Sequence, residues 1–374
     1  MRYRTGRLSA NSTCGQVRAY LAGVPNCHQL RSKAISPATV GSMTSYTYWL
    51  KGQNLQNFGD YLTDYFLTEL FTSEEIINSN VTVHLVGSVL SDWQVQADKI
   101  DHPENIAQIF WGVGARDGSS LSQLVSDPSN VILSVRGPET ASLVGDASGL
   151  VLGDPALLLP LIYAPKAGGV RIRKLVVPHF LDTRSDSQLL ATTGADTVLR
   201  PNISASREEV ERFISTICSA ERVLCGALHA AIVAEAYGVD YCYWDSGEID
   251  VPFKWQDFSL SVGRETVFTT SFSKWPEAPK DQCAKPISLL AIALSAPKIV
   301  KPEILRNALT FDLAKLGAAG LVSELSKSVH RSLRRFNASL LVVAERDGLV
   351  AERDDIQNSK LWRWSKFLRH REAS

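Results

Sequence analysis

The chain lacks several features that would place it in a specialised class of proteins. No uninterrupted apolar run reaches the roughly 18 residues that a membrane-spanning helix needs. The arginines near the N-terminus are not followed by a continuous apolar segment, so the sequence predicts no signal peptide. None of the six cysteines forms a CxxC pair, which argues against a zinc knuckle or a disulfide framework and fits a reducing cytosol. The 39 basic and 39 acidic residues balance, so bulk charge gives no reason to expect nucleic-acid binding.

What the chain does contain is typical of a globular α/β protein. Its 374 residues, 45% of them hydrophobic, suffice for two domains with cores of ordinary size. Short apolar runs that end in Gly, Ser, Arg or Asp alternate with helix-like segments, a pattern that predicts a parallel sheet with crossover helices. In the first half these runs are 81–86, 109–113, 131–135 and 151–152. A second such half begins near Arg173 with the strand KLVVPHF.

Changes in composition predict the domain boundaries. We expect a disordered N-terminal extension at 1–42, because this segment has no sustained periodicity and Met43 looks like the natural start. The segment APKAGG at 164–169 reads as a linker between the two α/β halves. The predicted parts after the extension are an N-terminal Rossmann-like domain at 43–163, a C-terminal Rossmann-like domain at 168–285, a helical return segment at 286–346 and a basic aromatic tail at 347–374.

The stretch 222–238, RVLCGALHAAIVAEAYG, predicts a strand, a tight turn and a helix, with His229 at the N-terminus of the helix. A helix N-terminus offers unpaired N–H groups and a partial positive charge to an anion. A histidine beside such an anion can deliver a proton near neutral pH. The alternative is an ordinary interior histidine.

Two cations follow predicted strands. Arg136 comes after the strand ILSV, where it can bind a carboxylate or phosphate bidentately or form an ion pair with Asp154 or Glu139. Lys254 lies in a predicted loop after a strand end, where a solvated lysine is the alternative.

Further candidate ligand-binding residues lie where open α/β sheets bind ligands, at the carboxyl ends of strands. Asn57, Gly59 and Asp60 fall in a predicted strand-to-helix loop, in which Asp60 is also a good N-cap. His179 follows another apolar strand. The glycine-rich segment GVGARDG at 112–118 fails as a dinucleotide fingerprint because Asp117 replaces its third glycine and no helix follows.

Several motifs, taken in order, resemble the polysaccharide pyruvyl transferase family over roughly residues 46–263, with weaker similarity up to about 336. They are NFGD at 57–60, SVRGPETASLVG at 134–145, GDPALLLP at 153–160, CGALHAAIVAEAYGV at 225–239 and PFKWQDFSLSVG at 252–263. The family has a histidine at the turn occupied by His229. Ala230 stands where many members have glycine, and Gly137 where many have aspartate.

Two α/β halves of similar size, each with candidate ligand-binding residues at strand ends, predict two Rossmann-like domains facing a cleft (GT-B-like), with C-terminal helices packing back across both. The resemblance implies transfer of the enolpyruvyl group of phosphoenolpyruvate to a sugar, with phosphate release and neither a metal nor a cofactor. His229 would be the acid, Arg136 and Lys254 would hold the donor, and Asn57, Gly59, Asp60 and His179 would complete the substrate site.

The residues leave other functions open. One is a GT-B-type nucleotide-sugar glycosyltransferase, and another is a non-catalytic glycan-binding relative. The tail KLWRWSKFLRHREAS mixes aromatic and basic residues, a composition suited to an anionic membrane surface or to a solvated helix end. We therefore expect a cytoplasmic protein, with peripheral contact at the inner face of the membrane if its acceptor is a lipid-linked oligosaccharide.

Overall fold

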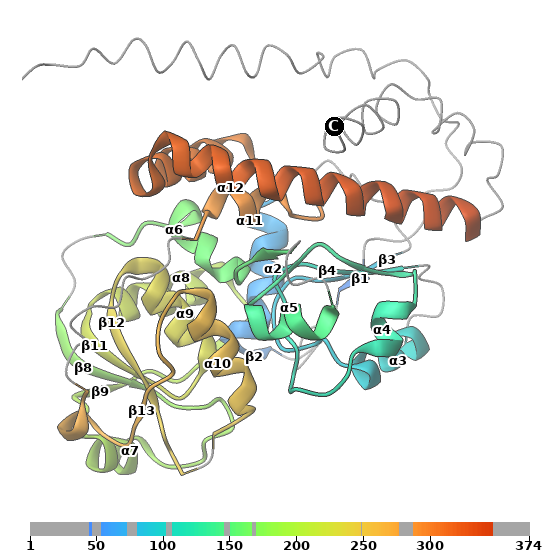
Figure 1. The fold of residues 1–374 in the computed structure, drawn as a ribbon. Coiled ribbons are helices and arrows are strands. Elements are labelled where there is room, and N and C mark those ends of the chain that lie inside the picture. The colour runs from blue at the N-terminus through green and yellow to red at the C-terminus, as the bar shows by residue number, and fades with distance from the viewer. Residues whose placement is uncertain are drawn as a thin grey trace, which may run out of the picture. The chain divides into compact units, whose positions relative to one another are not determined.

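The computed structural model describes eight stretches of the chain (Figure 1). They are residues 45–46, 54–72, 81–101, 107–145, 150–166, 170–247, 249–276 and 287–346, with side chains described except at 45, 46, 101 and 326–346. The predicted extension at 1–42 and the tail at 347–374 lie outside these stretches, so what the sequence predicts for them stays a prediction.

The chain has an α/β fold built on two parallel sheets, as the alternation of apolar runs and helices predicts (Figure 1). The first sheet has the order β1-β3-β4-β5, with β1 Ser45–Tyr46, β3 Val81–His84, β4 Ala107–Phe110 and β5 Asn130–Ile132. The second has the order β13-β12-β11-β8-β9, with β8 Ile172–Val177, β9 Thr197–Val198, β11 Ala220–Cys225, β12 Asp240–Trp244 and β13 Phe268–Thr269.

Two short strand pairs lie beside the large sheets. The parallel pair β6 (Ser134–Val135) and β7 (Val151–Leu152) places Arg136 and Gly153 at neighbouring strand ends. The pair β2 (Leu55–Asn57) and β10 (Asn202–Ser204) is antiparallel and joins segments from the two halves of the sequence. The sequence pattern did not predict this second pair.

Helices connect the strands. They are α2 Phe58–Glu69, α3 Asp92–Asp101, α4 Ser122–Ser126, α5 Pro138–Val144, α6 Leu159–Ile162, α7 Asp186–Thr193, α8 Arg207–Cys218, α9 Leu228–Tyr237, α10 Pro252–Ser261, α11 Leu289–Leu294 and α12 Pro302–Arg346, with 3-10 turns η2 at Pro155–Leu158 and η3 at Phe272–Lys274. Local sequence explains several of their ends: Ser206 caps α8, and Gly238, with a φ of 71°, ends α9 in the left-handed conformation that glycine adopts readily.

Two helix starts differ from the sequence prediction. Asn57 is the N-cap of α2, whose first amide, at Phe58, donates to the carbonyl of Pro201. Gly59 and Asp60 therefore lie in the first turn of a helix and not in a loop, and Asp60 is not the N-cap. Lys254 also lies in a helix, because Pro252 at the first position of α10 favours a helical start.

The largest hydrophobic cluster includes residues from both sheets and from the C-terminal helices. Phe58 of α2 stacks on Phe213 of α8, with ring centroids 3.9 Å apart. Trp111, which follows β4, donates its indole N–H to the carbonyl of Ile292 and to the Ser295 hydroxyl at the end of α11. The helices α11 and α12 thus pack back onto elements of the first half, including β5, β7 and α6.

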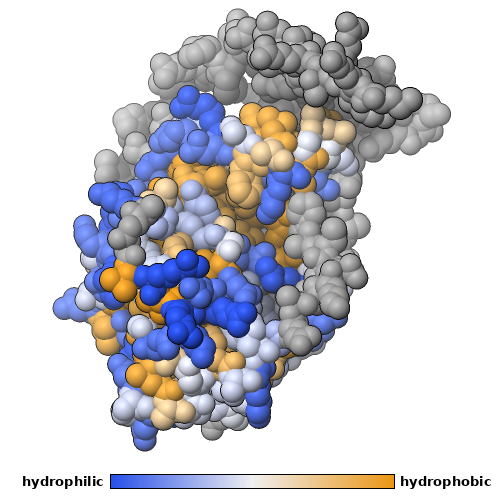
Figure 2. Space-filling model, turned by 90° about the vertical axis from the view of Figure 1, so that its left-hand side faces the viewer, coloured by the Kyte–Doolittle hydropathy of each residue, from blue (hydrophilic) through white to orange (hydrophobic). Residues whose placement is uncertain are grey.

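The surface mixes polar and apolar residues. On the face drawn in Figure 2, hydrophilic and hydrophobic residues lie in small interspersed groups. Large hydrophobic side chains that stay exposed come from separate elements, among them Trp93, Leu181 and Val322. Within the described stretches, no helix combines the length and the apolar character that a membrane span requires.

The contact between α5 and α10 leaves no room for a side chain at Gly137. A Cβ atom built there would lie 2.0 Å from the carbonyl oxygen of Asp257. The glycine therefore lets α10 approach the start of α5 closely, which matters because Arg136 immediately precedes it.

We expect Gly137→Ala to destabilise the fold by about 1–3 kcal/mol, because the backbone of α10 must move to admit a methyl group. Gly118→Ala is the matched control, since a Cβ there meets no atom within 4 Å. Urea unfolding followed by circular dichroism measures both. Equal midpoints for the two variants would show that the contact is not tight.

Candidate functional site

The seven residues singled out from the sequence line a single cavity of about 680 Å³. They come from both halves of the sequence. They are Asn57 at the end of β2, Gly59 and Asp60 in α2, Arg136 after β6, His179 after β8, His229 in α9 and Lys254 in α10. The structure therefore brings all seven together, which is their expected placement; their chemical roles remain predictions.

His229 lies at the second position of α9, with its side chain 13% exposed. Gly59 packs against the ring: a Cβ atom at this position would lie 2.0 Å from His229 Nδ1. The Nε2 atom is buried and has no hydrogen-bond partner, and Asp154 Oδ2 is 3.9 Å away. Gly59 thus serves the site by leaving space for the imidazole.

The electrostatic surroundings of His229 disfavour its charged form. Burial, together with the positive charges of Arg136 and Lys254, lowers the pKa of His229 to about 3. The imidazole in these surroundings is therefore neutral at pH 7. For His229 to act as an acid, an anion must first compensate the two neighbouring cations.

Arg136 is 1% exposed and is held by contacts with Ser88, between β3 and α3, and with Asp257 in α10. Its Nη1 donates to Ser88 Oγ at 3.1 Å, and its Nε lies 3.5 Å from Asp257 Oδ2. The sequence offered Asp154 or Glu139 as an ion-pair partner of Arg136. In the structure Arg136 pairs with Asp257 of α10. Nη2 has no hydrogen-bond partner, and Gly114 makes room for it, since a Cβ there would lie 2.0 Å away.

Asp257 is fully buried and links α10 to α5. Its Oδ1 accepts the backbone N–H of Thr140 at 3.0 Å, and its Oδ2 accepts the Thr140 hydroxyl at 2.7 Å. A buried carboxylate requires such partners, because an uncompensated charge in the interior is costly. Sequence reasoning missed Asp257, since nothing local to PFKWQDFSLSVG distinguishes it from an exposed aspartate.

Asp250 was also missed, and it lies between two predicted site residues. It forms an ion pair with Lys254, and its Oδ2 lies 3.5 Å from His179 Nε2. Bonding to His179 and the charge of Lys254 hold the pKa of Asp250 well below its usual range. Burial lowers the pKa of Lys254, although Asp250 opposes this shift. Lys254 is 13% exposed and thus not a solvated surface lysine.

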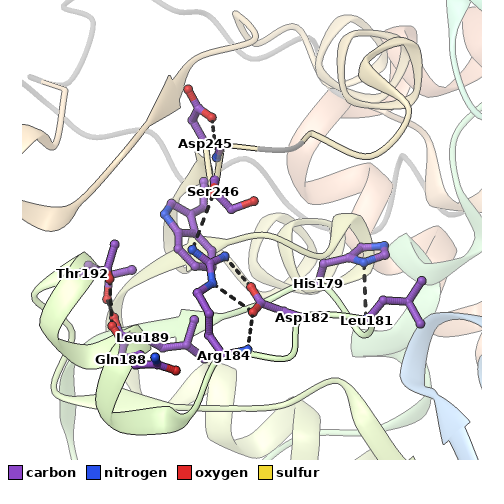
Figure 3. Close-up of polar contacts among 12 residues, drawn as sticks. His179, Leu181, Asp182, Arg184, Gln188, Leu189, Thr192, Asp245 and Ser246 are labelled. Carbon is purple, nitrogen blue, oxygen red and sulfur yellow. Dashed lines mark hydrogen bonds and ion pairs between the residues drawn. The ribbon is translucent and has the colours of Figure 1, made fainter.

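The loop that carries His179 is held by polar contacts (Figure 3). His179 Nδ1 accepts the N–H of Leu181 at 3.4 Å, which leaves its proton on Nε2, facing Asp250. Further along the loop, Arg184 Nε donates to Asp182 at 3.0 Å and its guanidinium stacks 4.7 Å over the Trp244 ring. The contacts with Leu181 and Asp250 orient the ring of His179, and those of Arg184 hold the loop further along.

Asp60 and Asn57 form a polar pair in the cavity wall, with Asn57 Nδ2 donating to Asp60 Oδ2 at 2.7 Å. Burial raises the pKa of Asp60 to about 6, although Asn57, Lys254 and His179 oppose the shift. A carboxylate with a pKa just below neutral can accept a proton from a bound hydroxyl and release it again.

The cavity is also lined by residues that the sequence did not indicate. Trp93 and Leu181 line the cavity while remaining 57% and 64% exposed. Arg116, from the glycine-rich segment dismissed as a nucleotide motif, is exposed and lines it too. Its backbone N–H donates to the carbonyl of Leu90, two residues before α3, which places Arg116 near Trp93.

The arrangement suits a small ligand with more than one negative charge. Three basic side chains, Arg116, Arg136 and Lys254, line the cavity with two histidines and two carboxylates. Basic groups bind phosphate and carboxylate, and Asp60 and His229 can each exchange a proton with a bound ligand. In the described part of the chain, no three His, Cys, Asp or Glu side chains are grouped as metal ligands would be.

Comparison with known proteins shows a similarity over part of the chain. The chain is 30% identical over 154 residues to the succinoglycan biosynthesis protein ExoV of Rhizobium meliloti (strain 1021), an alignment that covers 40% of this chain and 47% of that protein. The chain thus matches about half the length of this curated relative. No family model matches the chain. The relative's name refers to the biosynthesis of a glycan, the process that the motif resemblance also predicts.

The raised pKa of Asp60 predicts a measurable pH dependence of stability. An aspartate whose pKa is higher in the folded than in the unfolded chain stabilises the fold below pH 4 and loses this contribution as the pH rises through about 6. Relative to Asp60→Asn, the wild-type free energy of unfolding should therefore fall by up to about 3 kcal/mol between pH 4 and pH 7. Urea unfolding at several pH values tests this, and a constant difference would show that Asp60 titrates normally.

Proposed function

We propose that this protein transfers the enolpyruvyl group of phosphoenolpyruvate to two hydroxyls of a sugar, forming a pyruvate ketal during the biosynthesis of an exopolysaccharide or cell-surface glycan. The observation that carries the proposal is the single cavity in which His229 is buried beside two cations, Arg136 and Lys254, so that burial and their charges lower its pKa. A ligand bearing a carboxylate and a phosphate would compensate these cations and raise the pKa of the histidine, so that it takes up a proton.

The reaction has a simple balance of atoms. One sugar hydroxyl adds to C2 of phosphoenolpyruvate while C3 takes up a proton and becomes a methyl group. The second hydroxyl then replaces the phosphate at C2. Of the two hydroxyl protons, one balances the proton consumed at C3 and the other leaves with the phosphate. The protein must therefore supply an acid near C3, a base near the hydroxyls and cations for the leaving group.

The cavity residues divide among these tasks. Arg136 and Lys254 bind the carboxylate and phosphate of the donor, with His179 beside them. His229 protonates C3 once the bound anion has raised its pKa. Asp60 accepts a hydroxyl proton, and Asn57 orients its carboxylate through the 2.7 Å hydrogen bond. Holding donor and acceptor in alignment can itself lower the barrier by about 7–11 kcal/mol in favourable cases.

The architecture agrees with this proposal. We interpret the two parallel sheets as the cores of two Rossmann-like domains in a GT-B-like arrangement, with the boundary near 164–169. The contribution of both halves of the sequence to the cavity supports this interpretation. The relative in succinoglycan biosynthesis supports a saccharide acceptor. A nucleotide-sugar glycosyltransferase and a non-catalytic glycan-binding protein remain the competing functions.

A thermal shift assay tests the donor class directly. Phosphoenolpyruvate at 100 times its dissociation constant should stabilise the protein by about 2.7 kcal/mol, which corresponds to several degrees in Tm. A uridine diphosphate sugar at equal concentration should have no comparable effect, and Lys254→Met should weaken the response to phosphoenolpyruvate. A shift with the nucleotide sugar alone would favour a glycosyltransferase, and the absence of any shift would favour the non-catalytic alternative.

We expect His229→Ala to retain binding of phosphoenolpyruvate while losing most turnover, because proton delivery contributes in the transition state. General acid catalysis contributes about 10²–10⁴-fold, so kcat should fall by this factor. Isothermal titration and phosphate release measure the two effects separately. Near-normal turnover with a competent acceptor would transfer the role of acid to another residue, and His179→Ala is the variant to compare next.

A further inference from the structure

Behind His229, away from the cavity, lies a carboxylate that none of the roles above uses. Asp154 belongs to the segment between β7 and η2 and is fully buried, and it does not line the cavity. Its Oδ1 accepts the backbone N–H of Ala156 at 2.9 Å and so caps η2. Its Oδ2 is buried and has no hydrogen-bond partner, the same condition as His229 Nε2, 3.9 Å away.

Two unpartnered polar atoms that face each other in a protein interior are unusual, because each costs free energy unless it is paired. A shift of about 1 Å would bring Nε2 and Oδ2 to the roughly 2.8 Å of a charge-assisted hydrogen bond. In that bond the imidazole must donate, because an ionised carboxylate only accepts. Gly59 lies on the opposite edge of the ring, beside Nδ1.

We propose that Asp154 is a positioning residue for His229: its Oδ2 keeps the imidazole proton on Nε2 and so makes Nδ1 the atom that exchanges a proton with the ligand. The acid function of His229 rests on the proposed reaction, whereas the tautomer of its ring does not. When an anion occupies the cavity, the imidazolium ion then lies between two negative charges, the ligand at Nδ1 and Asp154 at Nε2.

Other charged groups around the ring do not provide this contact. Arg136 and Lys254 are cations that oppose protonation of His229. On α2, Asp60 directs its Oδ2 to Asn57, and Asp250 is engaged by Lys254 and His179. Asp257 is bound by Thr140 and Arg136. Burial raises the pKa of Asp154 to about 6, so it is largely ionised at pH 7 and can act as the acceptor.

The test is the ring tautomer of His229, measured by ¹⁵N NMR of the full chain labelled at histidine, at pH 7.5 and without ligand. The His229 signals are assigned by their absence from His229→Gln. We expect the wild type to carry the proton on Nε2. In Asp154→Asn, Oδ1 can still accept from Ala156, but the amide NH₂ now faces Nε2, so the proton should move to Nδ1.

Two comparisons isolate the effect. Asp60→Asn removes a carboxylate of the cavity wall and should leave the proton on Nε2. His84, whose Nε2 lies 3.2 Å from Asp98 in a separate buried pair, should be unchanged in every spectrum. If Asp154→Asn does not fold, Asp154→Ser retains a capping oxygen and should leave His229 as a mixture of tautomers.

A wild-type Nδ1–H tautomer, or an Nε2–H tautomer that persists in both Asp154 variants, would overturn the proposal. In turnover with phosphoenolpyruvate, Asp154→Asn should lower the pKa of the basic limb of the kcat profile by about 1–3 units, while donor affinity at a pH above that limb, where His229 is neutral in the complex, should not change. If the protein does not bind phosphoenolpyruvate, the proposed function fails, and the tautomer measurement still decides the role of Asp154.

Discussion

The site depends above all on the buried carboxylate of Asp257. It lies in α10, yet its partners are Arg136 and Thr140 from the other half of the sequence, so one interaction both joins two elements and fixes a cation of the cavity. Asp154 is its counterpart, because it comes from the first half and faces His229 of the second. Each half thus contributes a buried carboxylate that faces a basic residue of the other. Alignment of the cavity and cohesion of the fold therefore rest on the same contacts.

The sequence predicts much of this arrangement for a physical reason. In a parallel sheet the carboxyl ends of the strands meet at one edge, so His179 and His229, which follow β8 and β11 of the same sheet, could be expected to converge. Arg136 follows β6 of a different strand pair, and only the packing of the two halves brings it to the same cavity. The strand β12 and the glycine end of α9 follow from local preferences alone. Asp257, Asp250 and Asp154 could not be identified, because their roles depend on partners distant in sequence. The helical position of Asp60 could not be predicted either, because the first amide of α2 is bonded to the carbonyl of Pro201, which is distant in sequence.

The pKa shifts describe a site prepared for a charged ligand. Burial, together with the charges of Arg136 and Lys254, keeps His229 neutral, and burial also raises the pKa of Asp60. The lowered pKa of His229 and the raised pKa of Asp60 both favour the neutral form of the side chain. An anion that enters the cavity would raise the pKa of His229 again. His229 would therefore become protonated, and able to act as an acid, only when the donor binds. Such coupling would keep the histidine from protonating anything before the donor is in place.

The antiparallel pairing of β2 with β10 has a consequence for biosynthesis. During translation, β2 leaves the ribosome long before its partner strand β10 has been synthesised. The stacking of Phe58 on Phe213 likewise cannot form until the second half of the chain is made. The amino-terminal half therefore cannot finish folding as an autonomous unit during translation. Contacts of such high sequence separation slow folding and prolong exposure of apolar surface.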